Sequence, residues 1–188
     1  AVSKTFSLEK IKPLITHGHL HFGENKVQEA VDKWTEIKNL NKDIKLHMIG
    51  KLQTNKVKFV IPLFDYIHSL DNLKLAEKIS KEQNRLNKYL KIFIQVNIGN
   101  EDQKNGIDSS KLNDFYKICT HELKLNIIGL MCIPPQNSVE TYFSKMQKLN
   151  NSLNLKELSM GMSADYLEAT KYGSSFLRIG SKIFGLRN

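Results

Sequence analysis

Short apolar runs alternate along the chain with longer segments in which apolar residues recur at helical spacing. Alternating polar and apolar positions identify the short runs as strands, and spacings of three and four residues identify the longer segments as helices. A regular alternation of strand and helix is typical of parallel α/β architecture. Eight strands are predicted, at Ala1 to Lys4, Leu20 to Asn25, Lys45 to Ile49, Tyr66 to Leu70, Leu90 to Ile98, Asn126 to Met131, Glu157 to Met160 and Ser175 to Ile179.

The strand count favours a closed barrel. Eight parallel strands with intervening helices give an α/β fold of the (β/α)8 TIM type, and an open doubly wound sheet is the alternative. We expect residues 1–188 to form a single domain, because 188 residues with 40% hydrophobic content suffice for one sizeable core. The chain is shorter than the roughly 200 residues at the lower end for this fold. It also starts without Met inside an apolar run, so we expect that an N-terminal segment is missing.

Polar side chains occupy the ends of several predicted strands. Lys4, Asn25, His47 and Arg178 all lie at or near the last position of a strand. Functional groups gather at the carboxyl ends of the strands in both architectures. Because successive side chains alternate between the two faces of a strand, Lys4, Asn25 and Arg178 can all point into the barrel mouth.

Lys4 has the most distinctive chemistry of these residues. Desolvation and neighbouring cations lower the pKa of a lysine in a semi-buried mouth, and its amine can then attack a carbonyl group. Arg178 would be such a neighbouring cation. The alternative is that Lys4 extends its ammonium group into solvent near a chain terminus, as most lysines do.

Small residues follow the last two strands, in the turns Gly161-Met162-Ser163 and Gly180-Ser181. Barrels of this type often bind phosphate with the loops after strands seven and eight, through backbone N–H groups, hydroxyls and a helix dipole. Ser163, Gly180 and Ser181 fit these roles. The alternative is that Ser163 caps a helix and Gly180 forms an ordinary tight turn.

Charge and composition narrow the class of protein. The formal net charge of +9 could indicate a nucleic-acid partner, but nearly all the cations are lysines dispersed among asparagines. The densest stretch, Lys51 to Lys58, has little of the aromatic interleaving used to stack bases, so we expect no nucleic-acid partner. No apolar run approaches the roughly 18 residues of a membrane-spanning helix. No signal-peptide pattern is present either, and we therefore expect a cytoplasmic protein without a membrane partner.

Two further residue patterns have structural interpretations. Cys119 and Cys132 lie far apart without CxxC spacing, so we expect reduced thiols in the core. His17, His19 and His21 alternate, but no convergent carboxylate or cysteine accompanies them. We therefore predict no metal site, and we expect His21 inside the barrel.

Eight motifs, in order, resemble those of a known family. They are AVSKTF, FGENKVQEA, HMIGKLQTNK, IHSLDN, QVNIG, GLMCIPP, LSMGMSADYLEA and LRIGSKIFG. Together they cover essentially the whole chain, which is similar to the YggS/PROSC family of pyridoxal phosphate-binding proteins, also called pyridoxal phosphate homeostasis proteins. The departures are the missing start and Thr170, which stands where an aliphatic residue is expected.

The resemblance implies a fold-type III barrel related to the N-terminal domain of alanine racemase. It implies that Lys4 holds pyridoxal 5'-phosphate (PLP) as a Schiff base, and that Ser163, Gly180 and Ser181 hold the phosphate group.

The same resemblance implies that Arg178 faces the pyridine nitrogen of the cofactor, and that Asn25 and His47 lie near its ring. A permanently charged guanidinium favours the unprotonated ring and weakens the stabilisation of a carbanion. Arg178 alone does not exclude catalysis, because racemisation in alanine racemase occurs with such an arrangement.

Three functions remain open. The resemblance favours a monomeric carrier that buffers intracellular PLP and has PLP-dependent apoenzymes as recipients. A PLP-dependent amino-acid racemase or decarboxylase is the second, and the absence of a second domain after Asn188 that could bring an opposing acid or base argues against it. A basic nucleic-acid-binding domain is the third, and it predicts steeply salt-dependent binding without a chromophore.

Overall fold

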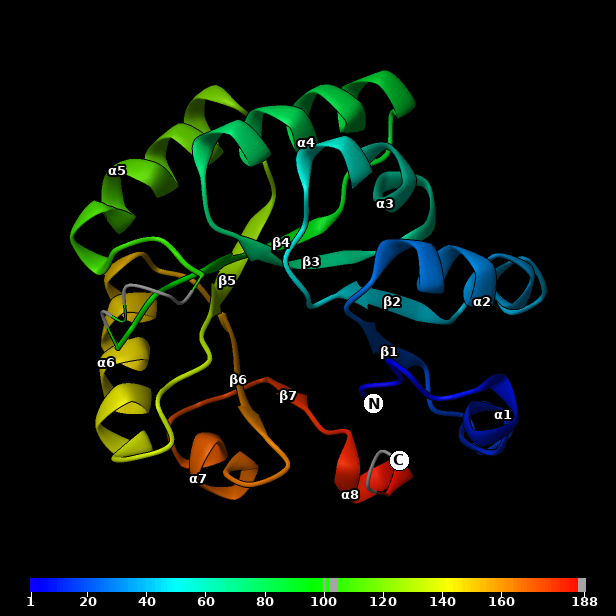
Figure 1. Cartoon of the computed structure of the whole chain (residues 1–188). Helices are drawn as coiled ribbons and strands as arrows, with labels where there is room; N and C mark the ends of the chain where they lie inside the picture. The colour runs from blue at the N-terminus through cyan, green and yellow to red at the C-terminus, as the bar shows by residue number, and fades with distance from the viewer. Residues whose placement is uncertain (100, 102–104, 186–188) are drawn as a thin grey trace.

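The computed structural model describes residues 1–99, 101 and 105–185. Its seven parallel strands pair in chain order from β1 to β7 (Figure 1). A doubly wound sheet would reverse its strand order at a switch point, so the open-sheet alternative is wrong. The strands are β1 (His21–Glu24), β2 (Lys45–Met48), β3 (Tyr66–Leu70), β4 (Lys91–Gln95), β5 (Ile127–Met131), β6 (Glu157–Met162) and β7 (Phe176–Arg178).

Helices connect the strands and lie around the outside of the sheet (Figure 1). Within the described residues, every helix is too short or too polar to cross a membrane. The α-helices are α1 (Leu8–Thr16), α2 (Val27–Leu40), α3 (Val57–Leu63), α4 (Leu73–Leu86), α5 (Leu112–Lys117), α6 (Val139–Ser152), α7 (Tyr166–Lys171) and α8 (Ser181–Phe184). Three short helical segments are η1 (Thr54–Lys56), η2 (Ser109–Lys111) and η3 (Ile118–Glu122).

The start of the chain closes the barrel without forming a strand. Val2 makes an isolated parallel bridge with Gly23 of β1, and the N–H of Gly23 donates to the oxygen of Ala1 at 2.8 Å. On the other side, the N–H of Val2 donates to the oxygen of Ile179, just after β7, at 2.7 Å. The predicted strand from Ala1 to Lys4 is thus reduced to a bridge, because the chain turns away at Lys4. It nevertheless occupies the eighth position between the two ends of the sheet.

The described residues form two hydrophobic clusters. The larger one lies between strands and helices and includes the fully buried Trp34 and Phe22. The smaller one contains Tyr66, Phe93 and Met131. Inward-facing histidines pack on it, so the barrel interior combines aromatic rings with buried polar groups.

Both cysteines are buried, as the sequence predicts. Burial raises the pKa of the Cys119 and Cys132 thiols to about 12. A thiol with such a pKa is not a reactive nucleophile near neutral pH. The two residues therefore act as small apolar side chains.

Candidate functional site

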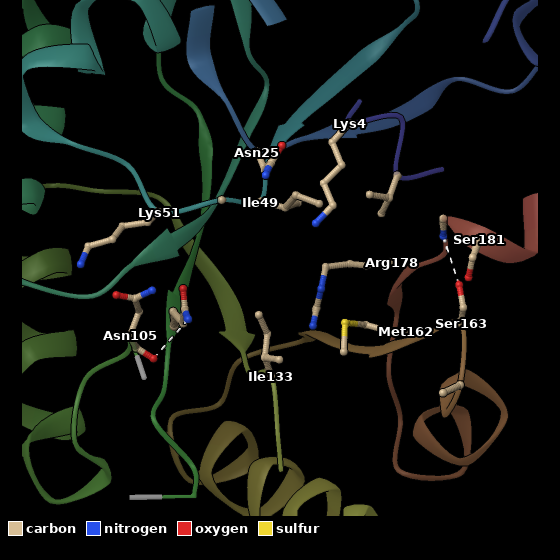
Figure 2. A pocket seen from close by; sticks show the side chains of 15 residues that line it. Lys4, Asn25, Ile49, Lys51, Asn105, Ile133, Met162, Ser163, Arg178 and Ser181 are labelled. Atoms are coloured by element: carbon tan, nitrogen blue, oxygen red, sulfur yellow. Dashed lines mark hydrogen bonds between the residues drawn. The ribbon is translucent and has the colours of Figure 1, made fainter. Parts of the chain in front are cut away.

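A cavity of about 640 Å³ opens at the carboxyl ends of the strands. Figure 2 shows Lys4 and Arg178 extending into the same space, with Asn25 beside them. The structure brings six of the seven residues proposed from the sequence to this cavity. Those six are Lys4, Asn25, Ser163, Arg178, Gly180 and Ser181, and the remaining lining residues are Val2, Ile49, Gly50, Lys51, Gln95, Asn105, Ile133, Met162 and Ala164.

Ser3, the residue before Lys4, is hydrogen-bonded to both members of a buried ion pair. The hydroxyl of Ser3 donates to Oε1 of Glu24 at 2.7 Å, and the oxygen of Ser3 accepts from Nζ of Lys33 at 3.1 Å. Lys33 and Glu24 form an ion pair at 3.1 Å, with side chains only 9% and 0% exposed. Because the loss of either partner would leave a buried charge uncompensated, the pair holds β1, α2 and Ser3 in one arrangement.

The backbone after Lys4 is bonded to the same helix. The N–H of Thr5 donates to Oε1 of Glu29 at 2.7 Å, and Glu29 is also ion-paired with Lys33. Partial burial would raise the pKa of Glu29, but hydrogen bonds from Thr5 and Lys33 outweigh it and lower the pKa. Thr5 has a φ of 68°. This left-handed conformation costs a β-branched residue on the order of 1–3 kcal/mol, so the bond to Glu29 holds a strained turn at Lys4.

Asn25 places an unsatisfied acceptor beside the cavity. Its Oδ1 atom is buried and accepts no hydrogen bond from any residue that the structure describes. The loop after β2 approaches it so closely that a Cβ atom on Gly50 would lie 2.4 Å from the backbone oxygen of Asn25. A buried acceptor without a partner is costly, and a ligand with a donor group would remove that cost.

The two loops with small residues are joined directly. The hydroxyl of Ser163 accepts a hydrogen bond from the N–H of Gly180 at 3.3 Å (Figure 2). Ser163 does not cap α7, since the residue at that N-terminus is Asp165, whose carboxylate accepts from the N–H of Met162. The loops after β6 and β7 therefore form one wall of the cavity. Their hydroxyls and backbone N–H groups are of the kind that binds phosphate.

Arg178 forms the floor of the cavity and is only 8% exposed. Nη1 donates to Oγ of Ser159 at 2.8 Å, and Nη2 donates to the oxygen of Cys132 at 2.7 Å. Burial lowers the pKa of this guanidinium. In the described part of the chain no carboxylate forms an ion pair with it. A hydrogen-bond acceptor on a ligand in the cavity would therefore stabilise this buried charge.

His47 lies beneath the cavity and does not line it. It borders a smaller cavity of about 50 Å³ inside the barrel, together with His21 and His68. Strand β2 ends at Met48, and the next residues, Ile49 and Gly50, occupy the mouth instead. His21 contacts His47 through its Nδ1 atom, while the residue itself is exposed. Among the described residues, no group of histidines, cysteines and carboxylates is arranged to hold a metal ion.

Sequence reasoning missed several residues of the site. Gln95 and Asn105 line the cavity and are linked by a hydrogen bond of 3.2 Å from the Gln95 amide to the Asn105 oxygen. Asn105 follows a long segment after β4, and no periodicity predicts where such a segment returns. Glu29 and Lys33 could have been found, because their spacing of four residues on one helix is typical of an ion pair.

Comparison with known proteins gives one consistent result. Residues 1–188 match the family model described as alanine racemase, N-terminal domain. The pyridoxal phosphate homeostasis protein of Aquifex aeolicus is 37% identical over 195 residues, which are 98% of this chain and 85% of that protein. PipY of Synechococcus elongatus PCC7942, solved with PLP bound, is 33% identical with a TM-score of 0.90, over 98% of this chain and 91% of PipY. The alanine racemase of Bartonella henselae, 17% identical with a TM-score of 0.75 over 98% of this chain and 53% of that one, shares the fold.

Proposed function

This chain belongs to the family of the alanine racemase N-terminal domain and, with its relatives, to the pyridoxal phosphate homeostasis proteins, and from this premise we propose that it binds PLP as a Schiff base on Lys4. One observation carries the proposal: an amine, a buried guanidinium and a wall of small residues with hydroxyl and N–H groups converge on one cavity. PipY, a relative with the same fold, was solved with PLP bound. The aldehyde, the phosphate and the ring nitrogen of that cofactor would each meet a group of suitable chemistry among the residues that line this cavity.

The roles of the side chains follow from their chemistry. The Lys4 amine would be the group that bonds covalently to the aldehyde of PLP, with loss of the carbonyl oxygen as water. Ser163 and Ser181 would donate hydrogen bonds to the phosphate, and the Gly180 N–H would exchange its bond to Ser163 for one to the phosphate. Arg178 would donate to the ring nitrogen. Asn25 would accept a hydrogen bond beside the ring. When bound, the cofactor supplies an electron-accepting conjugated ring.

We further propose that the protein is a carrier that buffers PLP and passes it to PLP-dependent apoenzymes. Among the described residues that line the cavity there is no histidine, tyrosine, carboxylate or thiol. Racemisation requires an acid or base opposite the cofactor lysine. The composition of the cavity therefore supports reversible binding over turnover. A single barrel domain, a monomer and a cytoplasmic location complete this proposal.

Absorption spectroscopy tests the binding mode. Added PLP should give a visible band, and borohydride should convert it to a stable adduct that peptide mapping places on Lys4. Lys4→Ala should abolish the band, while Lys148→Ala, an exposed lysine of α6, should retain it. An adduct on Lys51, the other lysine of the cavity among described residues, would contradict the assignment.

Transfer assays test the carrier role. The loaded protein should restore the activity of a PLP-dependent apoenzyme, and chiral chromatography should detect no conversion of L- or D-amino acids. Amino-acid turnover that is lost in Lys4→Ala would instead indicate an enzyme.

A further inference from the structure

A continuous chain of hydrogen bonds runs from the cavity floor to the opposite end of the barrel. Arg178 Nη1 donates to Ser159 Oγ at 2.8 Å, and that hydroxyl lies 2.8 Å from Nδ1 of His68. Nε2 of His68 lies 2.9 Å from Nδ1 of His47. Nε2 of His47 lies 2.9 Å from Nδ1 of His21, the first residue of β1. The chain thus begins beneath the candidate site and ends at an exposed histidine.

Arg178 fixes the direction of the first two bonds. A guanidinium can only donate, so Ser159 Oγ must accept from it. Ser159 is fully buried, and a buried hydroxyl needs an acceptor for its own hydrogen. Among the described residues, the acceptor within reach is Nδ1 of His68. His68 therefore carries no proton on Nδ1.

Hydrogen-bond donation keeps the same direction from one imidazole to the next. Burial, and secondly the charge of Arg178, lower the pKa of His68 well below its usual value, so the ring is neutral. A neutral imidazole that accepts at Nδ1 carries its proton on Nε2. His68 therefore donates to His47, and by the same rule His47 donates to His21. Every bond of the chain points away from Arg178.

We propose that Ser159, His68 and His47 are positioning residues that hold the Arg178 guanidinium in one orientation beneath the cavity, through a relay whose direction that guanidinium sets. The lone pairs of the hydroxyl and the imidazoles face the buried cation and replace the water that would otherwise solvate it. The stacking of His47 on Tyr66 and of His68 on Phe93, at centroid distances of 4.1 and 4.3 Å, holds both rings in plane for these bonds. The effect of these residues on PLP binding rests on the proposed function, whereas the direction of the hydrogen bonds from Arg178 to His21 does not depend on it.

The first test measures tautomers in the protein without PLP. Long-range proton–nitrogen NMR spectra of ¹⁵N-histidine-labelled protein at pH 8 should show His68, His47 and His21 protonated on Nε2 and bare on Nδ1. Arg178→Met removes the obligatory donor and should produce mixed tautomers at His68. A proton on Nδ1 of His68 in the unmodified protein, or unchanged tautomers in Arg178→Met, would overturn the relay.

The second test measures PLP affinity with a matched pair of variants. His68→Gln retains one donor and one acceptor and should bind PLP within about threefold of the unmodified protein, whereas His68→Leu should bind roughly tenfold more weakly. Equal affinity in both variants would refute the positioning role while leaving the proposed function intact. Absence of PLP binding to the unmodified protein would refute the proposed function, and the tautomer result would still decide the relay. The tautomers of the unmodified protein can be measured without any variant that could fail to fold.

Discussion

The Nζ atom of Lys33 lies 3.1 Å from the backbone oxygen of Ser3, the residue that precedes Lys4. The same ammonium group is ion-paired with Glu29, which accepts the N–H of Thr5, the residue that follows Lys4. Helix α2 therefore holds the backbone on both sides of the proposed cofactor lysine. Because neither contact involves the Lys4 side chain, changes in α2 should alter the site without removing the Lys4 amine.

Glu29→Ala should weaken PLP binding about fivefold and destabilise the protein by about 1 kcal/mol, because the strained turn at Thr5 loses its hydrogen bond. Glu29→Gln keeps a side-chain oxygen that can accept from Thr5 and should recover most of the affinity. Urea denaturation and PLP titration measure the two effects. Equal affinity in the alanine and glutamine variants would show that the bond to Thr5 does not position Lys4.

Asn25→Ala should destabilise the PLP-free protein by no more than about 0.5 kcal/mol, since the amide oxygen that it removes has no partner among the described residues. PLP affinity should nevertheless fall roughly tenfold, the usual consequence of losing one good hydrogen bond. Denaturation without ligand and titration with ligand separate these outcomes. A variant destabilised by more than about 2 kcal/mol would indicate that Asn25 has a structural role instead.

Ser163→Ala should weaken the binding of PLP more than that of pyridoxal, which lacks the phosphate group. The substitution removes the hydroxyl that joins the loops after β6 and β7, and one donor for the phosphate. Parallel titrations with the two ligands give the ratio of PLP affinity to pyridoxal affinity. We expect this ratio to be roughly tenfold lower in Ser163→Ala than in the unmodified protein. A ratio equal to that of the unmodified protein would place the phosphate elsewhere.

Stability should fall as the pH drops below about 6.5, the ordinary pKa of histidine. Burial first, and neighbouring positive charge second, hold the pKa values of His47 and His68 well below that value in the folded protein. In this window the unfolded chain binds a proton at each position and the folded protein does not. The free energy of unfolding should therefore decrease by up to about 1.4 kcal/mol per pH unit for each histidine.

Urea denaturation at pH 7.5 and pH 5.5, without PLP, measures this dependence. His47→Gln should reduce the pH dependence, because one of the two buried imidazoles is absent from both states. His121→Gln removes an exposed imidazole of η3 and provides the matched control, which should behave as the unmodified protein does. A stability independent of pH over this range would mean that the buried histidines are not neutral.

The positions of the seven strands from β1 to β7, and most of the candidate site, follow from the sequence alone, whereas the predicted first strand is only a bridge. A period of two fixes which side chains share a face, so the strand pattern by itself assigns Lys4, Asn25 and Arg178 to one opening. Small residues after the last two predicted strands indicate phosphate loops, because barrels often bind phosphate at that place. The sequence alone is sufficient for the shared strand faces and the small-residue loops, because each depends on only a few residues that are neighbours along the chain.

The depth of a side chain inside the barrel was decided only by the tertiary structure. His47 faces the barrel interior, but its place one layer below the cavity depends on the stagger between neighbouring strands, which no single strand encodes. The same holds for the pairing of Glu24 with Lys33 and for the chain of bonds from Arg178 to His21, whose members lie on different elements. The sequence therefore determined which residues gather at the ends of the strands. The packing of the strands against one another decided which of them line the cavity and which support Arg178 from beneath.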